Sequence, residues 1–169
     1  MVYKKIAVIG CAGSGKSYFS KEISSILSIQ CYHLDNLFWK PNWEETPNKQ
    51  FAKIIDNLVN KSEWIIDGNY ARTMKVRFAK ADIVFFLDMP TQLCLESEKA
   101  RRGIKRSDFP DYLEEKEDTE FLDWIKNFKN NDRNKIVALI KKYPNVKVVT
   151  FTSREQINNY LNELRNKTI

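Results

Sequence analysis

The sequence has few cysteines and no long apolar run, the features typical of disulfide-linked, zinc-binding and membrane-spanning proteins. Its three cysteines lie far apart, at positions 11, 31 and 94, without C-x-x-C spacing, so neither a disulfide framework nor a zinc site is indicated. The longest clean apolar run, Ile83–Leu87, is far short of the roughly 18 residues that a membrane span needs. The chain starts with a short segment that ends in Lys4 and Lys5, but the apolar run that follows covers only Ile6 to Ile9, too little for a signal peptide. We therefore expect a soluble, cytoplasmic protein without a membrane partner.

Length and charge set further bounds. A chain of 169 residues, 43% of them hydrophobic, is long enough for one domain with a full core, so we expect a single domain over residues 1–169. Lys and Arg number 28 against 22 for Asp and Glu, which gives a net charge of +6. That charge suits an anionic ligand but does not choose among ligands.

Glycine is scarce, and three of the five glycines fall within six residues. They belong to a stretch that fills the phosphate-binding pattern G-x-x-x-x-G-K-[ST] with Gly10, Cys11, Ala12, Gly13, Ser14, Gly15, Lys16 and Ser17. A short apolar strand precedes the stretch and a helical pattern follows it, which is the setting that the pattern requires. We predict that the loop amides and Lys16 bind the phosphates of ATP and that Ser17 is a Mg²⁺ ligand. The alternative is a glycine-rich turn that binds nothing.

Apolar runs and helical spacing alternate along the whole chain. Strands are predicted at residues 6–9, 30–34, 64–66, 83–87 and 146–151, and helices at residues 17–27, 46–59, 72–79 and 91–102 and after Ser153, which is predicted to cap the last one. This alternation predicts an α/β fold of three layers, a parallel sheet with helices on both faces.

Aspartates follow three of these strands, where ligands gather in parallel sheets. Asp67 ends an apolar strand as the Walker B residue does, so we predict that it holds Mg²⁺; the alternative is a simple Asp-Gly turn. Asp35 follows the second strand and is predicted to orient or deprotonate an acceptor hydroxyl, or to hold a metal-bound water, with a helix or turn cap as the alternative. For Asp88, capping is at least as plausible as catalysis.

Residues near Asp35 and Asp67 are candidates for binding the acceptor. Phe38 and Trp39, with Trp43, can form a stacking wall for a planar molecule, or can simply pack. Arg72 can bind an anionic group of the acceptor, or can form a surface ion pair of little energetic weight.

A basic, then acidic, then basic segment covers about residues 103–130 and is predicted to be a helical lid that returns to the core. A lid excludes water and can bring positive charge to a transferring phosphoryl group. The candidate phosphate clamps are Arg101, Arg102, Arg106 and Arg133. The alternative for each arginine is an ordinary solvated surface.

The sequence resembles the P-loop kinases of the adenylate kinase type, and more closely the bacterial DNA topology modulation proteins. The stretches that carry the second resemblance are the loop Gly10 to Ser17, residues 32–41, residues 64–70 and residues 121–125. The resemblance implies a five-stranded parallel sheet in the order 2-3-1-4-5, ATP and Mg²⁺ binding and a kinase-like lid. Where adenylate kinases have Asp-Gly-Phe-Pro-Arg, this chain has Asp67 to Arg72 with neither that proline nor that arginine spacing, which argues against AMP as acceptor.

These observations predict an ATP- and Mg²⁺-dependent phosphotransferase acting on a small acceptor. A nucleotide-dependent, DNA-associated regulator is the alternative from another class, although no helix-turn-helix or zinc module is visible and acidic blocks interrupt the basic clusters. A plain ATPase is the third possibility. The acceptor and the oligomeric state stay open.

Overall fold

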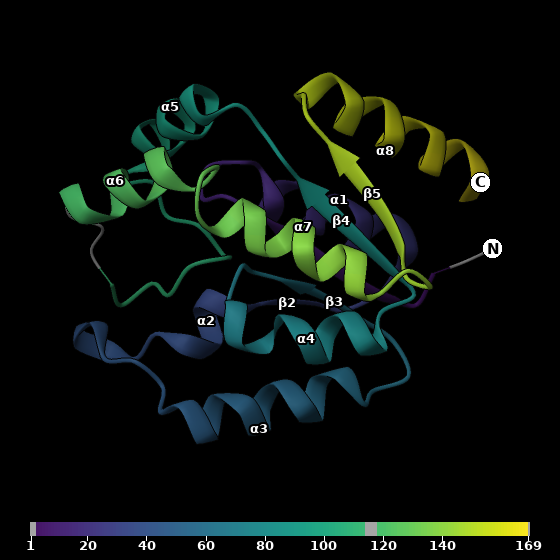
Figure 1. Ribbon diagram of the computed structural model, residues 1–169, viewed down its shortest axis with the longest axis horizontal. Coiled ribbons are helices and arrows are strands. Elements are labelled where there is room, and N and C mark those ends of the chain that lie inside the picture. The colour runs from purple at the N-terminus through teal and green to yellow at the C-terminus, as the bar shows by residue number, and fades with distance from the viewer. Residues whose placement is uncertain (1–2, 114–117, 169) are drawn as a thin grey trace.

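The computed structural model describes residues 3–113 and 118–168, so residues 114–117 of the predicted lid and the ends of the predicted domain lie outside it. One five-stranded parallel sheet has the order β2-β3-β1-β4-β5, which confirms the predicted fold (Figure 1). The strands are β1 (Lys5–Gly10), β2 (Cys31–His33), β3 (Trp64–Asp67), β4 (Ile83–Leu87) and β5 (Lys147–Phe151). Strand β4, which lies between β1 and β5, is buried along its whole length, in keeping with its unbroken apolar run.

The strand register brings the predicted functional positions to one edge of the sheet. Asp67 pairs with Val8 of β1 on one side and with His33 of β2 on the other. Gly10, where the phosphate loop begins, pairs with Leu87 at the end of β4. The carboxyl ends of β1 to β4 therefore converge on the phosphate loop.

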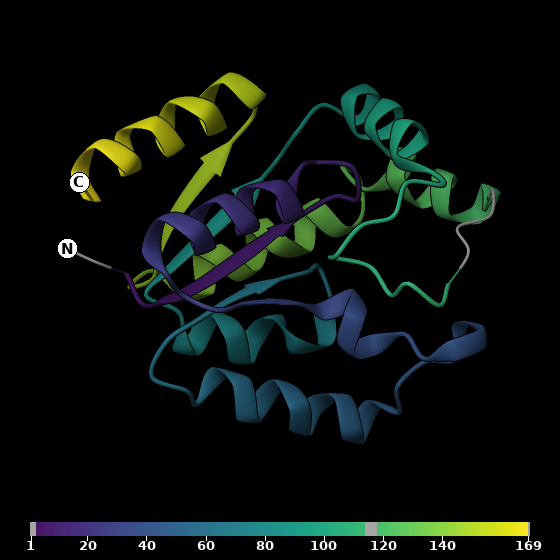
Figure 2. The same ribbon diagram turned by 180° about the vertical axis from the view of Figure 1, so that it is seen from behind.

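Helices cover both faces of the sheet and its carboxyl edge. They are α1 (Lys16–Leu27), α2 (Leu34–Phe38), a 3-10 turn η1 (Pro41–Trp43), α3 (Asn48–Val59), α4 (Ala71–Lys80), α5 (Thr91–Arg101), α6 (Thr119–Asn127), α7 (Asp132–Lys142) and α8 (Arg154–Thr168). Helices α4 and α7 lie in front of the sheet in Figure 1, and α1 lies in front of it when the molecule is seen from behind in Figure 2. Helices α5 and α6 pack together beyond the carboxyl ends of the strands. No helix within the described ranges is both long and apolar enough to cross a membrane.

Two local expectations differ from the structure. Leu34, predicted to end the second strand, instead begins α2, because Leu34, Leu37 and Phe38 recur at helical spacing and Leu34 is fully buried. The second difference concerns the return from the predicted lid, which consists of two helices, α6 and α7, for which no separate bounds were predicted. The predicted capping of α8 is confirmed, since the Ser153 hydroxyl accepts the Gln156 amide at 3.2 Å.

Candidate active site at the carboxyl edge of the sheet

The phosphate loop is shaped by its contact with α5. Gly13 has a φ of 71°, and a Cβ there would lie 2.1 Å from the carbonyl oxygen of Cys94, so only glycine fits. Gly15, with a φ of 94°, is the residue from which α1 starts. Lys16 folds back over the loop and donates from Nζ to the carbonyl oxygen of Cys11 at 2.9 Å. The loop thus holds an ammonium group at the positive end of a twelve-residue helix, a suitable setting for phosphate.

A cavity of about 500 Å³ opens beside this loop. It brings together predicted residues of different strands and helices, namely Ala12, Lys16, Ser17, Asp35, Trp39, Asp67, Arg101 and Arg102. Residues that were not predicted as site residues also line it, among them Tyr70, Glu98, Phe109, Phe121, Trp124 and Lys135. Its size lies within the range of small-molecule sites.

Asp67 is held by a histidine on the neighbouring strand. The carboxylate is only 4% exposed, and its Oδ2 is hydrogen bonded to His33 Nδ1 at 2.9 Å. The other oxygen, Oδ1, is buried without any hydrogen-bond partner in the structure. A buried, unpartnered carboxylate oxygen in a cavity that also contains Ser17 is suited to a hard cation or a donor from a ligand.

Asp35 is held in the same way from the turn after β3. The Tyr70 hydroxyl donates to Asp35 Oδ1 at 2.6 Å. Burial raises the pKa of Asp35, and the Tyr70 hydroxyl and the charge of Lys16 offset part of that rise. A carboxylate with a raised pKa is a better proton acceptor than an ordinary aspartate.

The turn that carries Tyr70 is fixed from below by Arg77 of α4. This fully buried guanidinium donates to the carbonyl oxygens of Gly68, at 2.7 Å, and Tyr70, at 3.1 Å. Burial lowers the pKa of Arg77 to about 10, which still leaves it charged at neutral pH. Arg77 therefore positions the segment between the two acids.

Aromatic rings form the side of the cavity next to Asp35. The centroid of Trp43 lies 5.4 Å from that of Trp39 and 5.6 Å from that of Phe109. Phe38, predicted to face a ligand, instead packs on Phe51 and Tyr70 behind this wall and does not line the cavity. Its centroid distance of 4.9 Å to Trp39 shows that it supports the wall.

No family model and no curated protein matches the sequence. Solved structures do match. Shikimate kinase from Acinetobacter baumannii in complex with shikimate is 12% identical, with a TM-score of 0.62 over 97% of this chain and 94% of that one. Deoxyadenosine kinase from M. mycoides with bound dATP is 17% identical, with a TM-score of 0.55 over 96% and 97%.

Shikimate kinase from Aquifex aeolicus is 20% identical, with a TM-score of 0.57 over 96% of both chains. The chain has the P-loop kinase fold. In a P-loop kinase fold the strand edge described above is where ligands gather, which agrees with the position of the cavity.

Within this P-loop kinase fold, the segment after α5 is docked on the site. Asp108 is 6% exposed, interacts with Lys21 of α1 at 3.3 Å and with Arg106 at 3.4 Å, and lies near the Ser17 hydroxyl. Burial works to raise the pKa of Asp108, but the Ser17 hydroxyl and these two cations outweigh it and lower that pKa.

Two hydrogen bonds extend this docking to α2. The Tyr112 hydroxyl donates to the carbonyl oxygen of Trp39 at 2.6 Å, and Asn36 donates to that of Ser107 at 2.9 Å. The described part of the predicted lid thus contacts both the phosphate loop and the aromatic wall.

The four predicted lid arginines are not in equivalent positions. Arg101 and Arg102 line the cavity, with Arg101 ion-paired to the buried Glu98. Arg106 instead lies near Asp108 and over the ring of Phe109, and Arg133 donates to Asp88 at 2.8 Å. Asp88 thus holds α7 against the end of β4 rather than lining the cavity.

Arg72 is not brought into the cavity either. It lies on the exposed side of α4 and donates to Asn48 of α3. The functional-site partners that sequence reasoning missed are His33, Tyr70, Arg77 and Asp108. Two of them had a usable signal: His33 lies near the end of a strand predicted beside the one that ends in Asp67, and Arg77 shares the helical spacing of the buried Thr73 and Met74.

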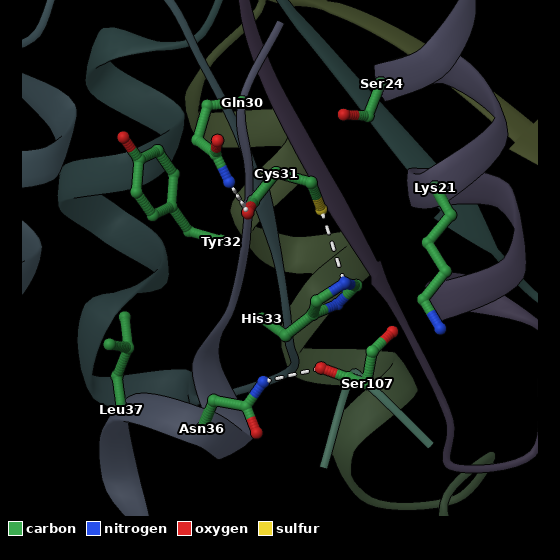
Figure 3. A pocket seen from close by; sticks show the side chains of 9 residues that line it. All are labelled: Lys21, Ser24, Gln30, Cys31, Tyr32, His33, Asn36, Leu37 and Ser107. Carbon is green, nitrogen blue, oxygen red and sulfur yellow. Dashed lines mark hydrogen bonds between the residues drawn. The ribbon is translucent and has the colours of Figure 1, made fainter. Parts of the chain in front are cut away.

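A second, more open cavity of about 430 Å³ lies on the other side of His33. Figure 3 shows Cys31 and His33 of β2 facing Lys21 of α1 across it, with His33 Nε2 3.7 Å from Cys31 Sγ. Burial, and then the charge of Asp67, raise the pKa of Cys31 to about 12, so this thiol is protonated and a weak nucleophile.

Proposed function

We propose that this chain is a cytoplasmic, Mg²⁺-dependent phosphotransferase that moves the γ-phosphoryl group of ATP to a hydroxyl of a small acceptor. The observation that carries the proposal is the single cavity that contains Lys16 and Ser17 of the phosphate loop together with Asp35 and Asp67. The kinases that share the fold, including one with bound dATP, support the proposal.

The donor is proposed to bind along Gly10 to Ser17. The backbone amides of this loop and the start of α1 bind phosphate oxygens, and Lys16 exchanges the carbonyl of Cys11 for the β- and γ-phosphates. Because the ammonium is already beside the loop, this exchange needs only a side-chain rotation.

Ser17 and Asp67 are proposed to hold Mg²⁺. The unpartnered, buried Oδ1 of Asp67 fits this role, and His33 fixes the other oxygen. Among residues 3–113 and 118–168, no group of three or more His, Cys, Asp or Glu side chains could hold a metal. That absence agrees with magnesium, which binds through one or two protein ligands plus substrate phosphates. When bound, the ion offsets the negative charge of the transferring group.

Asp35 is proposed to accept the proton of the acceptor hydroxyl. The acceptor oxygen forms a bond to the γ-phosphorus while the bond from that phosphorus to the bridging oxygen breaks, ADP leaves, and the proton passes to the Asp35 carboxylate. Arg101 and Arg102, which line the cavity, stabilise the charge on the transferring group.

The test is ADP formation from ATP and Mg²⁺ with a panel of hydroxyl acceptors, in the wild type, Lys16→Ala and Lys53→Ala. Lys53 is an exposed lysine of α3 outside the cavity, which makes it the matched control. We expect one or more acceptors to accelerate ADP formation, and Lys16→Ala to lower kcat/KM by about 10²- to 10³-fold. Turnover that no acceptor accelerates would leave a plain ATPase, and absence of ATP binding would refute the proposal.

A nucleotide-dependent, DNA-associated regulator is the second candidate. Its support is the resemblance to DNA topology modulation proteins together with the net charge of +6. Binding of duplex DNA that weakens steeply with salt and depends on ATP would support this candidate. If no binding is found at low salt, this candidate loses its basis.

A further inference from the structure

The side of the cavity around Asp35 has a distinct chemistry, and the inference from it rests on the proposed function. We define the acceptor wall as Asp35, Trp39, Trp43, Tyr70 and Phe109, all of which line the cavity. Its rings form a continuous series, because Trp39 contacts Trp43 and Trp43 contacts Phe109. Such a surface suits a flat ring, which stacks on indole or phenyl groups.

The acceptor wall contains no cation within the part of the chain that the structure describes. The cations that line the cavity are Lys16, Arg101, Arg102 and Lys135, which come from the phosphate loop, α5 and α7. The candidates on the acceptor side are engaged elsewhere. Arg106 lies over the ring of Phe109 but is ion-paired to Asp108. Arg72 donates to Asn48, and Arg77 donates to backbone carbonyls behind Tyr70. A phosphate or carboxylate of the acceptor would therefore find no dedicated partner at this wall.

Two carboxylates act on the part of the acceptor wall beside Tyr70, whereas the charges of Lys16 and Arg101 act on Asp35 from the side proposed for ATP. Burial first, and then the charges of Asp35 and Glu45, raise the pKa of Tyr70. Both carboxylates thus act on the same part of the cavity. An acceptor with its own negative charge would be repelled by them.

We propose that the acceptor is an uncharged, planar heterocycle that carries a hydroxyl group, that is, a nucleoside rather than a nucleoside monophosphate or a hydroxy acid. The heterocycle stacks on Trp39 and Trp43, and the hydroxyl donates to Asp35. Lys16, Arg101 and Arg102, which also line the cavity, are the groups proposed to bind the phosphates of ATP.

Tryptophan fluorescence tests this proposal directly, since Trp39 and Trp43 are in the wall. The probes are adenosine and thymidine, their 5′-monophosphates, and shikimate as an anionic hydroxy acid, each titrated in the presence of Mg²⁺ and a non-hydrolysable ATP analogue. We expect at least one nucleoside to bind ten or more times more tightly than its monophosphate, and to give the higher kcat/KM for ADP formation. Equal or tighter binding of a monophosphate or of shikimate, or binding of neither nucleoside, would overturn the proposal.

Variants separate stacking and charge from general damage. Trp39→Leu should raise the KM for the nucleoside about tenfold while the Kd for the ATP analogue stays the same. The matched control is Tyr3→Leu, which removes an aromatic side chain just before β1, at the end of the sheet away from the cavity. Asp35→Asn should reduce the discrimination against monophosphates, because it removes the repelling charge. Unchanged discrimination in Asp35→Asn, or an equal KM increase in both aromatic variants, would count against the proposal.

The failure of this inference can be told from failure of the proposed function. ATP binding, and its loss in Lys16→Ala, is measured without any acceptor. If ATP binds and only monophosphates are phosphorylated, the chain is a kinase of another specificity and only the acceptor assignment is wrong. If ATP does not bind, the proposed function itself fails.

Discussion

Asp35 experiences opposing influences on its proton affinity, and these influences make its pH behaviour testable. Burial raises the pKa of Asp35, while the hydroxyl of Tyr70 lowers it. The net effect is a raised pKa, so the ionised, proton-accepting form is lost at a higher pH than for an ordinary aspartate.

We expect kcat for transfer to fall on the acid side as Asp35 becomes protonated. In Tyr70→Phe, the hydroxyl that favours the ionised form is absent, so the acid limb should move to higher pH. In Asp35→Asn, kcat should be about 10²- to 10⁴-fold lower and should lose this limb. The measurement is kcat against pH at saturating ATP and acceptor. An acid limb at the same pH in wild type and Tyr70→Phe would contradict the assignment.

The same shift predicts an effect of opposite sign on stability. Between the ordinary pKa and the raised one, folded Asp35 retains a proton that the unfolded chain has released. The contribution of Asp35 to stability is therefore greatest at low pH and declines as pH rises through the raised pKa. We expect Asp35→Asn to lack this decline in stability. A wild-type residue that lowers stability in this way is common where the residue is kept for activity.

The site residues differ in what was needed to identify them from the sequence. Lys16, Ser17, Asp35 and Asp67 were predictable because a motif or a strand end marks them. The contrast between Arg72 and Arg77 needed the helix face: Arg77 lies on the buried side of α4 with Thr73 and Met74, and Arg72 does not. That helical spacing can be seen in the sequence. A buried arginine is uncommon, however, so Arg72 rather than Arg77 was predicted as a site residue.

At the scale of elements, the segment between α5 and α6 is held to the phosphate loop by a buried carboxylate. Asp108 contacts Ser17 and Lys21 of α1, and its pKa is lowered because these favourable contacts outweigh burial. Its stabilising contribution is present above the ordinary aspartate pKa and is lost as pH falls through the lowered value.

We expect Asp108→Asn to weaken this docking and to open the segment about tenfold more often, as suits the loss of one charge-assisted hydrogen bond. The measurement is the rate of limited tryptic cleavage after Lys105 and Arg106 at neutral pH. Asp111→Asn is the matched control. The Asp111 carboxylate is 68% exposed, and its ion pair with Lys105, at 3.7 Å, is on the surface. Equal cleavage of Asp108→Asn and Asp111→Asn would show that the carboxylate does not hold the segment.

The parallel sheet was predictable from alternating patterns, and its strand order from the family resemblance, whereas the docked segment was not predictable from either. Strands such as β4 are apolar throughout and are bounded by turns, so their ends were placed well. Residues 103–113 have no regular helix or strand, and their position depends on single contacts such as Tyr112 with Trp39. The charge reversal marked this segment as an excursion, but charge alone does not say which groups it meets.

At the scale of the whole molecule, ligand binding is coupled to folding. The loop, the acids and the docked segment come together at one edge of the sheet only in the folded chain. If Mg²⁺-ATP binds only the folded chain, 100 times its Kd should add about 2.7 kcal/mol of stability. For a chain of this size that corresponds to a rise in Tm of about 5 to 11 °C. Thermal unfolding with and without Mg²⁺-ATP measures it, and Lys16→Ala should show little rise. A comparable rise in both chains would place the binding outside the loop.

Helix α5 has a further consequence for how this chain can vary among its relatives. Near its start, the carbonyl of Cys94 meets Gly13, and at its end Arg101 lines the cavity. Cys94 and Arg101 are seven positions apart, about two helical turns, so they lie on the same face of the helix. One inserted or deleted residue between them would rotate Arg101 by about 100° away from the cavity. We therefore expect evolution to accept many substitutions in this helix but to preserve its length.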